Sequence, residues 1–381
     1  MSFRATTDAY QQFLRETLEL ARRGRGLASP NPMVGAIVVD SSGAKVGEGF
    51  HTYDGRKHAE LLALEAAGDS ARGSTLYVSL EPCSVHSRTP PCADAVITAG
   101  VARVVSATRD ENPEVDGTGY DRMRDAGIEV VEADAEIAAE AHRLNEAFFH
   151  YARTGKPLVT LKTAVTLDGK IAAPDDNSGW ITSEVARAHV QQVRHEHDAI
   201  LTGIGTVQAD DCLLTDRSEL PRRRPLMRIV ADSLLRLSMD SKIVQSAAGD
   251  LVIASTSAAR EGRRELFDER QIPVEIFDAP AGRVDLPALI EWLGTQQITS
   301  LMIEAGSKLN WGALEGGVVD KMLLYYAPKI LGGIDSLPMV GGVGRRSRAG
   351  ALRLENLKIL PIAKDEFAVE AYIVKQTSAM A

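Results

Sequence analysis

Three short segments carry side chains that bind metals or move protons. His58-Ala59-Glu60 is followed by Pro82-Cys83 and by Pro91-Cys92. One imidazole and two thiolates hold a zinc ion and leave its fourth position to water, whose pKa the metal lowers from 15.7 to about 7. A nearby carboxylate takes the proton as water attacks and returns it to the departing ammonia. The pattern predicts His58, Cys83 and Cys92 as zinc ligands and Glu60 as the catalytic residue of a hydrolytic deamination.

Cysteine usage favours a metal site over a disulfide. The chain has 3 cysteines, and two of them lie in this stretch, whereas Cys212 is far away in sequence. Deaminases commonly place two residues between the cysteines, but residues 84–91 separate them here. Two alternatives stay open at this point: a closed structural zinc site with His86 as fourth ligand, and a pair of inert buried cysteines.

The surrounding residues predict the elements that position the site. Because residues i and i+2 do not face the same way inside a helix, His58 and Glu60 must lie at the very start of one. The apolar run at 59–67 is strongly helical and Gly68 ends it. A strand at 75–80 precedes the first cysteine, and Pro91 opens a helix with Cys92 in its first turn, where free N–H groups favour a thiolate.

Strands alternate with helices through the first half, which predicts an α/β domain with a sheet covered on both faces. The remaining expected elements are strands at 34–40, 45–50, 102–108 and 128–132, and helices at 8–23, 119–126 and 134–153. Gly155 and Pro157 then form a helix stop. We therefore expect one domain over residues 1–153 and a second over residues 154–381, since 381 residues exceed the size at which one core stops growing.

The second domain repeats the α/β alternation without a metal-binding cluster. Its expected elements are strands at 158–166, 199–203, 226–231, 251–254, 300–304 and 321–327, and a helix at 183–197. Glycines follow two of these strands, at Gly203 and Gly205 and at Gly306, where a helix start could hold a phosphate. Neither segment has the GxGxxG spacing of dinucleotide-binding turns. Trp180 could stack on a flat ring or fill the core, and position alone favours the core.

Composition excludes several classes of partner. A net charge of −9 and 5% aromatic residues argue against a nucleic-acid surface, which needs clustered cations and stacking rings. No apolar stretch has the length of a membrane span, and the N-terminus lacks the pattern of a signal peptide. We expect a cytoplasmic enzyme with a small-molecule substrate, in a compartment where thiols stay reduced.

Further motifs occur in order along nearly the whole chain. In the first half they are Asn31-Pro32-Met33-Val34-Gly35, Gly49-Phe50-His51, Glu81-Pro82-Cys83, Arg88-Thr89-Pro90-Pro91-Cys92 and Asp110-Glu111-Asn112-Pro113. In the second they include Leu161-Lys162, Leu167-Asp168-Gly169-Lys170, Trp180-Ile181-Thr182, Gly205-Thr206-Val207, Ala209-Asp210-Asp211, Leu214-Thr215, Glu304-Ala305-Gly306 and Ala327-Pro328-Lys329. With these motifs the sequence resembles the bifunctional deaminase/reductase family of riboflavin biosynthesis, in which the long gap between the cysteines is normal.

The resemblance implies a fold and two reactions. It implies a cytidine-deaminase-like three-layer α/β/α domain followed by a dihydrofolate-reductase-like α/β domain. The first would use Zn²⁺ to deaminate a diaminopyrimidinone carrying a ribosylamino 5-phosphate. The second would use NADPH to reduce the ribosyl chain to ribityl. It also implies a homo-oligomer.

The resemblance further implies contacts, residue by residue. Those to the first substrate are Asn31, His51, Arg88 and Asn112. Those to the cofactor are Ala164, Trp180, Thr206, Asp210, Ser233, Gly306, Ser307, Lys308 and Leu309, and those to the second substrate are Ser178, Arg194, Leu214, Arg217 and Glu304. Asp210 and Glu304 are also candidates for the acid that protonates the reduced sugar oxygen. The chain departs from the family pattern at Val85 and Ser87, between the cysteines.

Three other functions are also compatible with parts of the sequence pattern. The second domain could be a non-catalytic nucleotide-binding or dimerising module beside a nucleotide deaminase. The first could act on RNA, which its acidity and few aromatic residues disfavour. Finally, the zinc could be structural, in an interaction domain that catalyses no reaction. Removal of the metal by a chelator would then unfold that domain.

Overall fold

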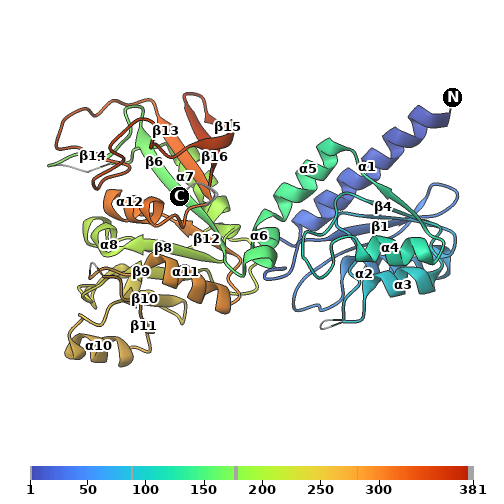
Figure 1. The fold of residues 1–381 in the computed structure, drawn as a ribbon, viewed down its shortest axis with the longest axis horizontal. Coiled ribbons are helices and arrows are strands. Elements are labelled where there is room, and N and C mark those ends of the chain that lie inside the picture. Colours follow the sequence, from blue (N-terminus) through green and yellow to red (C-terminus); the bar gives the residue numbers. More distant parts are fainter. Residues whose placement is uncertain (1, 87–88, 176–178, 281, 376–381) are drawn as a thin grey trace. The chain divides into compact units, whose positions relative to one another are not determined.

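The computed structural model describes residues 2–86, 89–175, 179–280 and 282–375, with the side chains before residue 10 left aside. The chain forms two compact units (Figure 1). Unit 1 comprises Met1–Gly155 together with Pro221–Arg224, and unit 2 comprises Lys156–Leu220 and Pro225–Ala381. The returning segment of unit 1 is held by Arg223, whose guanidinium lies 4.2 Å from the ring centre of Tyr53 and whose Nε donates to Ser29 O at 3.0 Å.

Unit 1 is built on a five-stranded sheet in the order β2-β1-β3-β4-β5. The strands are β1 (Gly35–Val39), β2 (Lys45–Phe50), β3 (Thr75–Val78), β4 (Arg103–Ser106) and β5 (Glu129–Glu132). Strand β1 pairs antiparallel with both β2 and β3, whereas β3, β4 and β5 are parallel. The carboxyl ends of the parallel strands therefore meet at one edge, and the segment with Cys83 leaves from there.

Helices cover both faces of this sheet, as the alternating pattern predicts. They are α1 (Ser2–Arg22), α2 (Ala59–Ala67), α3 (Cys92–Ala99), α4 (Thr118–Asp125), α5 (Ala135–Leu144) and α6 (Glu146–Thr154), with a 3-10 turn η1 at Gly68–Ala71. Leu14 and Leu18 of α1 join Ile137 of α5 in one core cluster. On the other face, Ala63 of α2 and Val96 of α3 pack with α4. The unit thus has three layers.

The predicted helix over 134–153 is interrupted, which corrects that prediction. Asn145 separates α5 from α6 with φ −112° and ψ 18°. Its side chain leaves the helical pattern, because Oδ1 accepts from Met33 N at 2.8 Å and Nδ2 donates to Met33 O at 2.9 Å. A long-range pair of hydrogen bonds thus overrides local helix propensity, and it ties the chain just after Asn31 to the helical layer.

Unit 2 contains a nine-stranded sheet in the order β11-β10-β9-β8-β12-β6-β13-β16-β15. Its strands are β6 (Leu158–Thr166), β8 (Ala199–Gly203), β9 (Met227–Ala231), β10 (Leu251–Ser255), β11 (Val274–Ile276), β12 (Ser300–Ile303), β13 (Lys321–Ala327), β15 (Leu354–Ala363) and β16 (Glu366–Ile373). The run from β11 to β13 is parallel, and β16 and β15 continue it antiparallel. A small sheet pairs β7 (Lys170–Ala172) with β14 (Leu337–Pro338).

Two apolar clusters lie on opposite faces of the large sheet. Its helices are α7 (Glu184–His195), α8 (Ile204–Asp210), α9 (Lys242–Gln245), α10 (Glu261–Asp268), α11 (Leu286–Thr295) and α12 (Ser307–Glu315). Val190 of α7 and Phe267 of α10 belong to one cluster, and Leu289 of α11 and Ala313 of α12 to the other. The sequence prediction missed the hairpin β15–β16. Among the described residues, no helix combines the length and apolarity needed to cross a bilayer.

Candidate active sites

The three predicted zinc ligands converge at the carboxyl edge of the unit 1 sheet. His58 Nδ1 lies 3.1 Å from Cys92 Sγ and 3.6 Å from Cys83 Sγ. The three ligand atoms all lie within 4.8 Å of one another. His58 is the N-cap of α2, and Cys92 is the first residue of α3, so two helix starts face the segment that follows β3.

Helix α2 lies unusually close to β2, which fixes where His58 and Glu60 sit. A Cβ atom at Gly47 would lie 2.1 Å from Ala63 O, and one at Gly49 would lie 2.9 Å from Ala59 O. Real side chains do not tolerate such contacts with backbone atoms, so glycine at these strand positions allows the helix to dock. The approach places Glu60 in the first turn, as the helical pattern predicts.

The electrostatics of this group fit a zinc ion with a bound water. Burial raises the pKa of Glu60 to about 7, with Cys83 adding to the rise and His58 opposing it. Oε2 of this carboxylate is buried without a hydrogen-bond partner in the described structure. Hydrogen bonding with Cys92 and His58 lowers the pKa of Cys83, whereas the neighbouring sulfur and burial raise that of Cys92. One imidazole, two sulfurs and a carboxylate needing a polar partner match a catalytic zinc site.

The closed-site alternative receives no support from the geometry. His86 is exposed and does not belong to the ligand group formed by the other three residues. Cys212 is likewise outside that group, and burial raises the pKa of its thiol to about 11, as suits an inert residue.

Two of the residues that family resemblance assigns to the first substrate border the zinc ligands. His51 is 2% exposed, and its ring centre lies 5.0 Å from that of His58. Its Nε2 lies 3.0 Å from Asn31 Nδ2, so the two side chains are linked by a hydrogen bond. Asn112 lies in the loop between β4 and α4. Arg88 falls outside the described residues.

A buried charge cluster lies in unit 2 at Glu304, directly after β12. Its carboxylate binds Lys162 Nζ at 3.0 Å, and Arg194 donates to its other oxygen through Nε at 3.1 Å and Nη2 at 2.9 Å. Burial acts to raise the pKa of Glu304, but Lys162 and Arg194 more than offset it and bring the pKa to about 2. Glu304 is therefore ionised at neutral pH and has no proton to give. Lys162 lies in the Leu161-Lys162 motif, but the family resemblance does not assign it a contact.

The glycine-rich turns after β8 and β12 are joined to each other. Gly306 N donates to Thr206 Oγ1 at 3.1 Å. Gly306 is the N-cap of α12 without a side-chain cap, and Ser307 in its first turn is 7% exposed, with an Oγ that has no described hydrogen-bond partner. Free N–H groups and an unpartnered hydroxyl at a helix start fit a phosphate group.

The other predicted unit 2 residues lie on several different elements. Ser233 follows β9, Lys308 and Leu309 lie in α12, Ala164 lies in β6, and Asp210 ends α8, where burial raises its pKa. Leu214 is buried with φ +53°, and Arg217 is exposed. Ser178 lies outside the described residues.

Trp180 does not fill the core, contrary to the prediction from its position. The residue is 69% exposed, and the Arg187 guanidinium lies 4.8 Å from its ring centre. Its backbone is held by Lys329, whose Nζ donates to Trp180 O at 2.7 Å. The Trp180 ring is therefore on the surface, its backbone is held by Lys329, and the ring retains a face for stacking.

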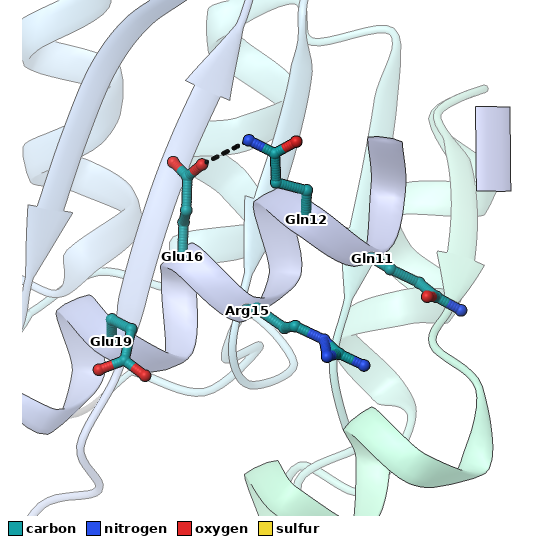
Figure 2. A pocket seen from close by; sticks show the side chains of 5 residues that line it. All are labelled: Gln11, Gln12, Arg15, Glu16 and Glu19. Atoms are coloured by element: carbon teal, nitrogen blue, oxygen red, sulfur yellow. Dashed lines mark hydrogen bonds between the residues drawn. The ribbon is translucent and has the colours of Figure 1, made fainter. Parts of the chain in front are cut away.

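A shallow pocket along α1 carries no comparable chemistry. Figure 2 shows that its lining comes from a single helix, with Gln12 donating to Glu16 at 3.1 Å. Its members are Gln11, Gln12, Arg15, Glu16 and Glu19. An exposed polar helix face of this kind is ordinary solvated surface.

Comparisons with known proteins agree with this arrangement. Residues 157–366 match the family model of the RibD C-terminal domain, and residues 7–108 match the cytidine and deoxycytidylate deaminase zinc-binding region. The chain is 39% identical to riboflavin biosynthesis protein RibD of Actinobacillus pleuropneumoniae over 98% of this chain and 97% of that protein. This chain belongs to the RibD family. It is also 43% identical to RibD of Escherichia coli (strain K12), over 86% of this chain and 91% of that protein.

Solved RibD structures extend the likeness to the whole fold. Acinetobacter baumannii RibD, form 1, has a TM-score of 0.83 at 34% identity, covering 97% of this chain and 100% of that one. A deaminase/reductase from Thermotoga maritima has a TM-score of 0.79 at 32% identity, with the same coverage.

The family assignment agrees with the expected chemistry of both units. The matched zinc-binding region contains His58, Cys83 and Cys92, so the first unit of this RibD-family chain is a zinc-dependent deaminase. The second unit is an NADPH-dependent reductase rather than a non-catalytic module. Together they form a bifunctional enzyme of riboflavin biosynthesis.

Proposed function

We propose that unit 1 deaminates 2,5-diamino-6-ribosylamino-4(3H)-pyrimidinone 5′-phosphate and that unit 2 then reduces the ribosyl side chain to ribityl. The Thermotoga maritima relative is named as a diaminohydroxyphosphoribosylaminopyrimidine deaminase and 5-amino-6-(5-phosphoribosylamino)uracil reductase. The observation that carries the proposal is the juxtaposition, in unit 1, of a two-sulfur, one-imidazole donor set with the unpartnered buried oxygen of Glu60.

In the first reaction the residues of the chain would hold the ring and move protons. Zinc, when bound, supplies an acidic water. Glu60, buried beside the three ligands, would hold a proton next to the reacting ring and deliver it to the leaving amino group. Asn31 and His51 would contact the substrate, and their 3.0 Å link beside the ligand His58 supports this assignment. We assign Arg88 and Asn112 to the same substrate by family resemblance.

In the second reaction the residues would orient cofactor and sugar. NADPH, when bound, supplies the hydride, so the protein has to bring two carbons together and stabilise charge on the sugar oxygen. Gly306 and Ser307 would hold a cofactor phosphate. Lys308 and Leu309, the next residues of α12, would contribute to the same site. Lys162 and Arg194 are both bound to Glu304. We propose that they also donate to the anionic ribotide.

We assign the other contacts by family resemblance. To the cofactor these are Ala164, Trp180, Thr206, Asp210 and Ser233, and to the second substrate Ser178, Leu214 and Arg217.

Product analysis tests both reactions together. Purified protein is incubated with the diamino ribotide, with and without NADPH, and the products are identified by mass. Without NADPH we expect the deaminated ribotide alone, and with NADPH its ribityl counterpart. Unchanged starting material under both conditions, from protein that contains zinc, would contradict the proposal.

We also propose a homo-oligomer that works in the cytoplasm, with the deaminase over residues 1–153 and the reductase over residues 154–381. The edge strand β15 supports self-association, because Leu354, Leu357 and Ile359 are 43%, 58% and 65% exposed. The three free cysteines suit a reducing compartment. Light scattering of the intact protein tests the assembly, and a monomer at all concentrations would refute it.

A further inference from the structure

The carboxylate of Glu81 is a hub for backbone N–H groups. The residue follows β3 and is 2% exposed. Its Oε2 accepts from Asp110 N at 3.2 Å and from Gly117 N at 3.0 Å. Its Oε1 accepts from Gly119 N at 2.9 Å and from Tyr120 N at 3.3 Å. One side chain thus satisfies four buried donors that come from a single stretch of chain.

These bonds do two things to that stretch. Helix α4 begins at Thr118 after Gly117, whose missing side chain provides no cap, so Oε1 of Glu81 caps the helix from outside. A negative charge at a helix start is also favoured by the helix dipole. Oε2 accepts from the first and the last residue of the loop over residues 110–117. It therefore holds the two ends of the loop together. Glu81 therefore holds the base of the loop, in addition to the hydrogen bonds that the loop makes within itself.

Asn112 lies inside this closed loop with a defined orientation. Its backbone N donates to Asp110 Oδ1 at 2.8 Å, and its O accepts from Val115 N and Asp116 N. Its side-chain Oδ1 accepts from Glu114 N at 3.2 Å. That leaves Nδ2, which makes no hydrogen bond to the described residues, as the group that Asn112 can offer to a ligand. An amide N–H₂ donates, so its partner must be an acceptor oxygen or nitrogen.

The start of α4, which follows this loop, contacts the segments that carry both zinc cysteines. Ser84, next to Cys83, lies 2.5 Å from Thr118 through the two hydroxyl oxygens. Arg122 of α4 binds Asp94, two residues after Cys92, at 2.6 Å. Close packing adds a third restraint, because a Cβ atom at residue 119 would lie 2.1 Å from Pro82 O. The loop of Asn112 is thus built onto the segment that carries the metal ligands.

We propose that Glu81 is a positioning residue for deamination, which presents Asn112 Nδ2 to an acceptor atom of the pyrimidinone ribotide. This inference rests on the proposed function of unit 1. Glu81 itself touches no reacting atom, since both of its oxygens are occupied by backbone donors. Its contribution is to hold the loop in the bound shape before substrate arrives, so its loss should weaken binding of the substrate.

Glu81→Gln tests this with a minimal change of shape. The amide retains one oxygen and turns an N–H₂ group toward backbone N–H groups, so two of the four bonds are lost. We expect KM for the diamino ribotide to rise by about 10-fold or more, with a smaller fall in kcat. Zinc content should stay at the wild-type value, and reduction of the deaminated ribotide by the same sample should be unchanged. Glu114→Gln, an exposed carboxyl in the same loop, is the matched control and should behave as wild type.

A double-mutant cycle separates positioning from a general loss of structure. If Glu81 acts through Asn112, then Glu81→Gln should raise KM little further in an Asn112→Ala background. Additive effects on KM, or a fall in kcat alone that tracks the loss of folded protein, would overturn the inference. A wild-type chain with zinc but without deaminase turnover would instead refute the proposed function, so the two failures give different results.

Discussion

Lys162 Nζ lies 3.0 Å from Glu304 Oε1, where Lys162 is part of β6 and Glu304 directly follows the neighbouring parallel strand β12. Lys162 is only 7% exposed along its side chain, and Glu304 is 23% exposed. Arg194 binds the other oxygen of the same carboxylate. The ion cluster therefore lies at the carboxyl end of β12, beside the middle of β6.

The Lys162–Glu304 pair gives unit 2 a defined acid sensitivity. The pKa of Glu304 is lowered to about 2 in the folded protein, against 4.5 for the ordinary group. Its stabilising effect is therefore complete above about pH 4.5 and is lost as the pH falls toward 2. Lys162→Met should raise this pKa and destabilise unit 2 by roughly 3 kcal/mol at neutral pH. Denaturant unfolding followed between pH 3 and 7 measures both effects, and a pH dependence identical to wild type would contradict them.

Glycine at position 47 is expected to be essential for the deaminase site. Gly47→Ala places a methyl group 2.1 Å from Ala63 O, so α2 must shift and carry His58 and Glu60 with it. We expect deaminase activity to fall at least about 10-fold, with a loss of stability of roughly 1–3 kcal/mol. The control is Gly262→Ala in α10, whose new Cβ would meet only Glu265 Oε2 at 4.0 Å. Wild-type deamination by Gly47→Ala would show that α2 tolerates displacement.

The ligand set predicts a contrast between two cysteines. Cys92→Ser should lose zinc and deaminase activity, because a serine hydroxyl does not replace a thiolate in such a site. Cys212→Ser should retain both, since Cys212 lies outside the ligand group. Metal analysis of the two purified variants decides the matter. Equal zinc content in both would mean that the ligands are assigned wrongly.

Local sequence patterns were enough to predict the elements that carry the zinc site. The helix over 59–67 and the strand over 45–50 have the predicted bounds, because glycine, proline and apolar periodicity define them locally. The break at Asn145 was not predictable, since its cause is a pair of hydrogen bonds to Met33, more than a hundred residues away. The hub at Glu81 is hidden for the same reason, because its four partners are backbone groups that only the fold assembles.

Charge pairing in unit 2 was the other feature that sequence alone left open. Arg194 could equally have been a surface charge by its position in a helix, yet it is 7% exposed and bound to Glu304. Residue type makes Glu304 a candidate acid, but its two bound cations keep it ionised. Burial and long-range partners, rather than residue type, decide such roles.

Activity of the Glu60→Gln variant measured together with its zinc content tests the central claim most directly. Glutamine keeps the size of the side chain but cannot shuttle protons. We expect zinc at the wild-type level, reduction of the deaminated ribotide unchanged, and deamination lowered by about 100-fold or more. Deamination near the wild-type rate in a zinc-loaded Glu60→Gln protein would contradict the account.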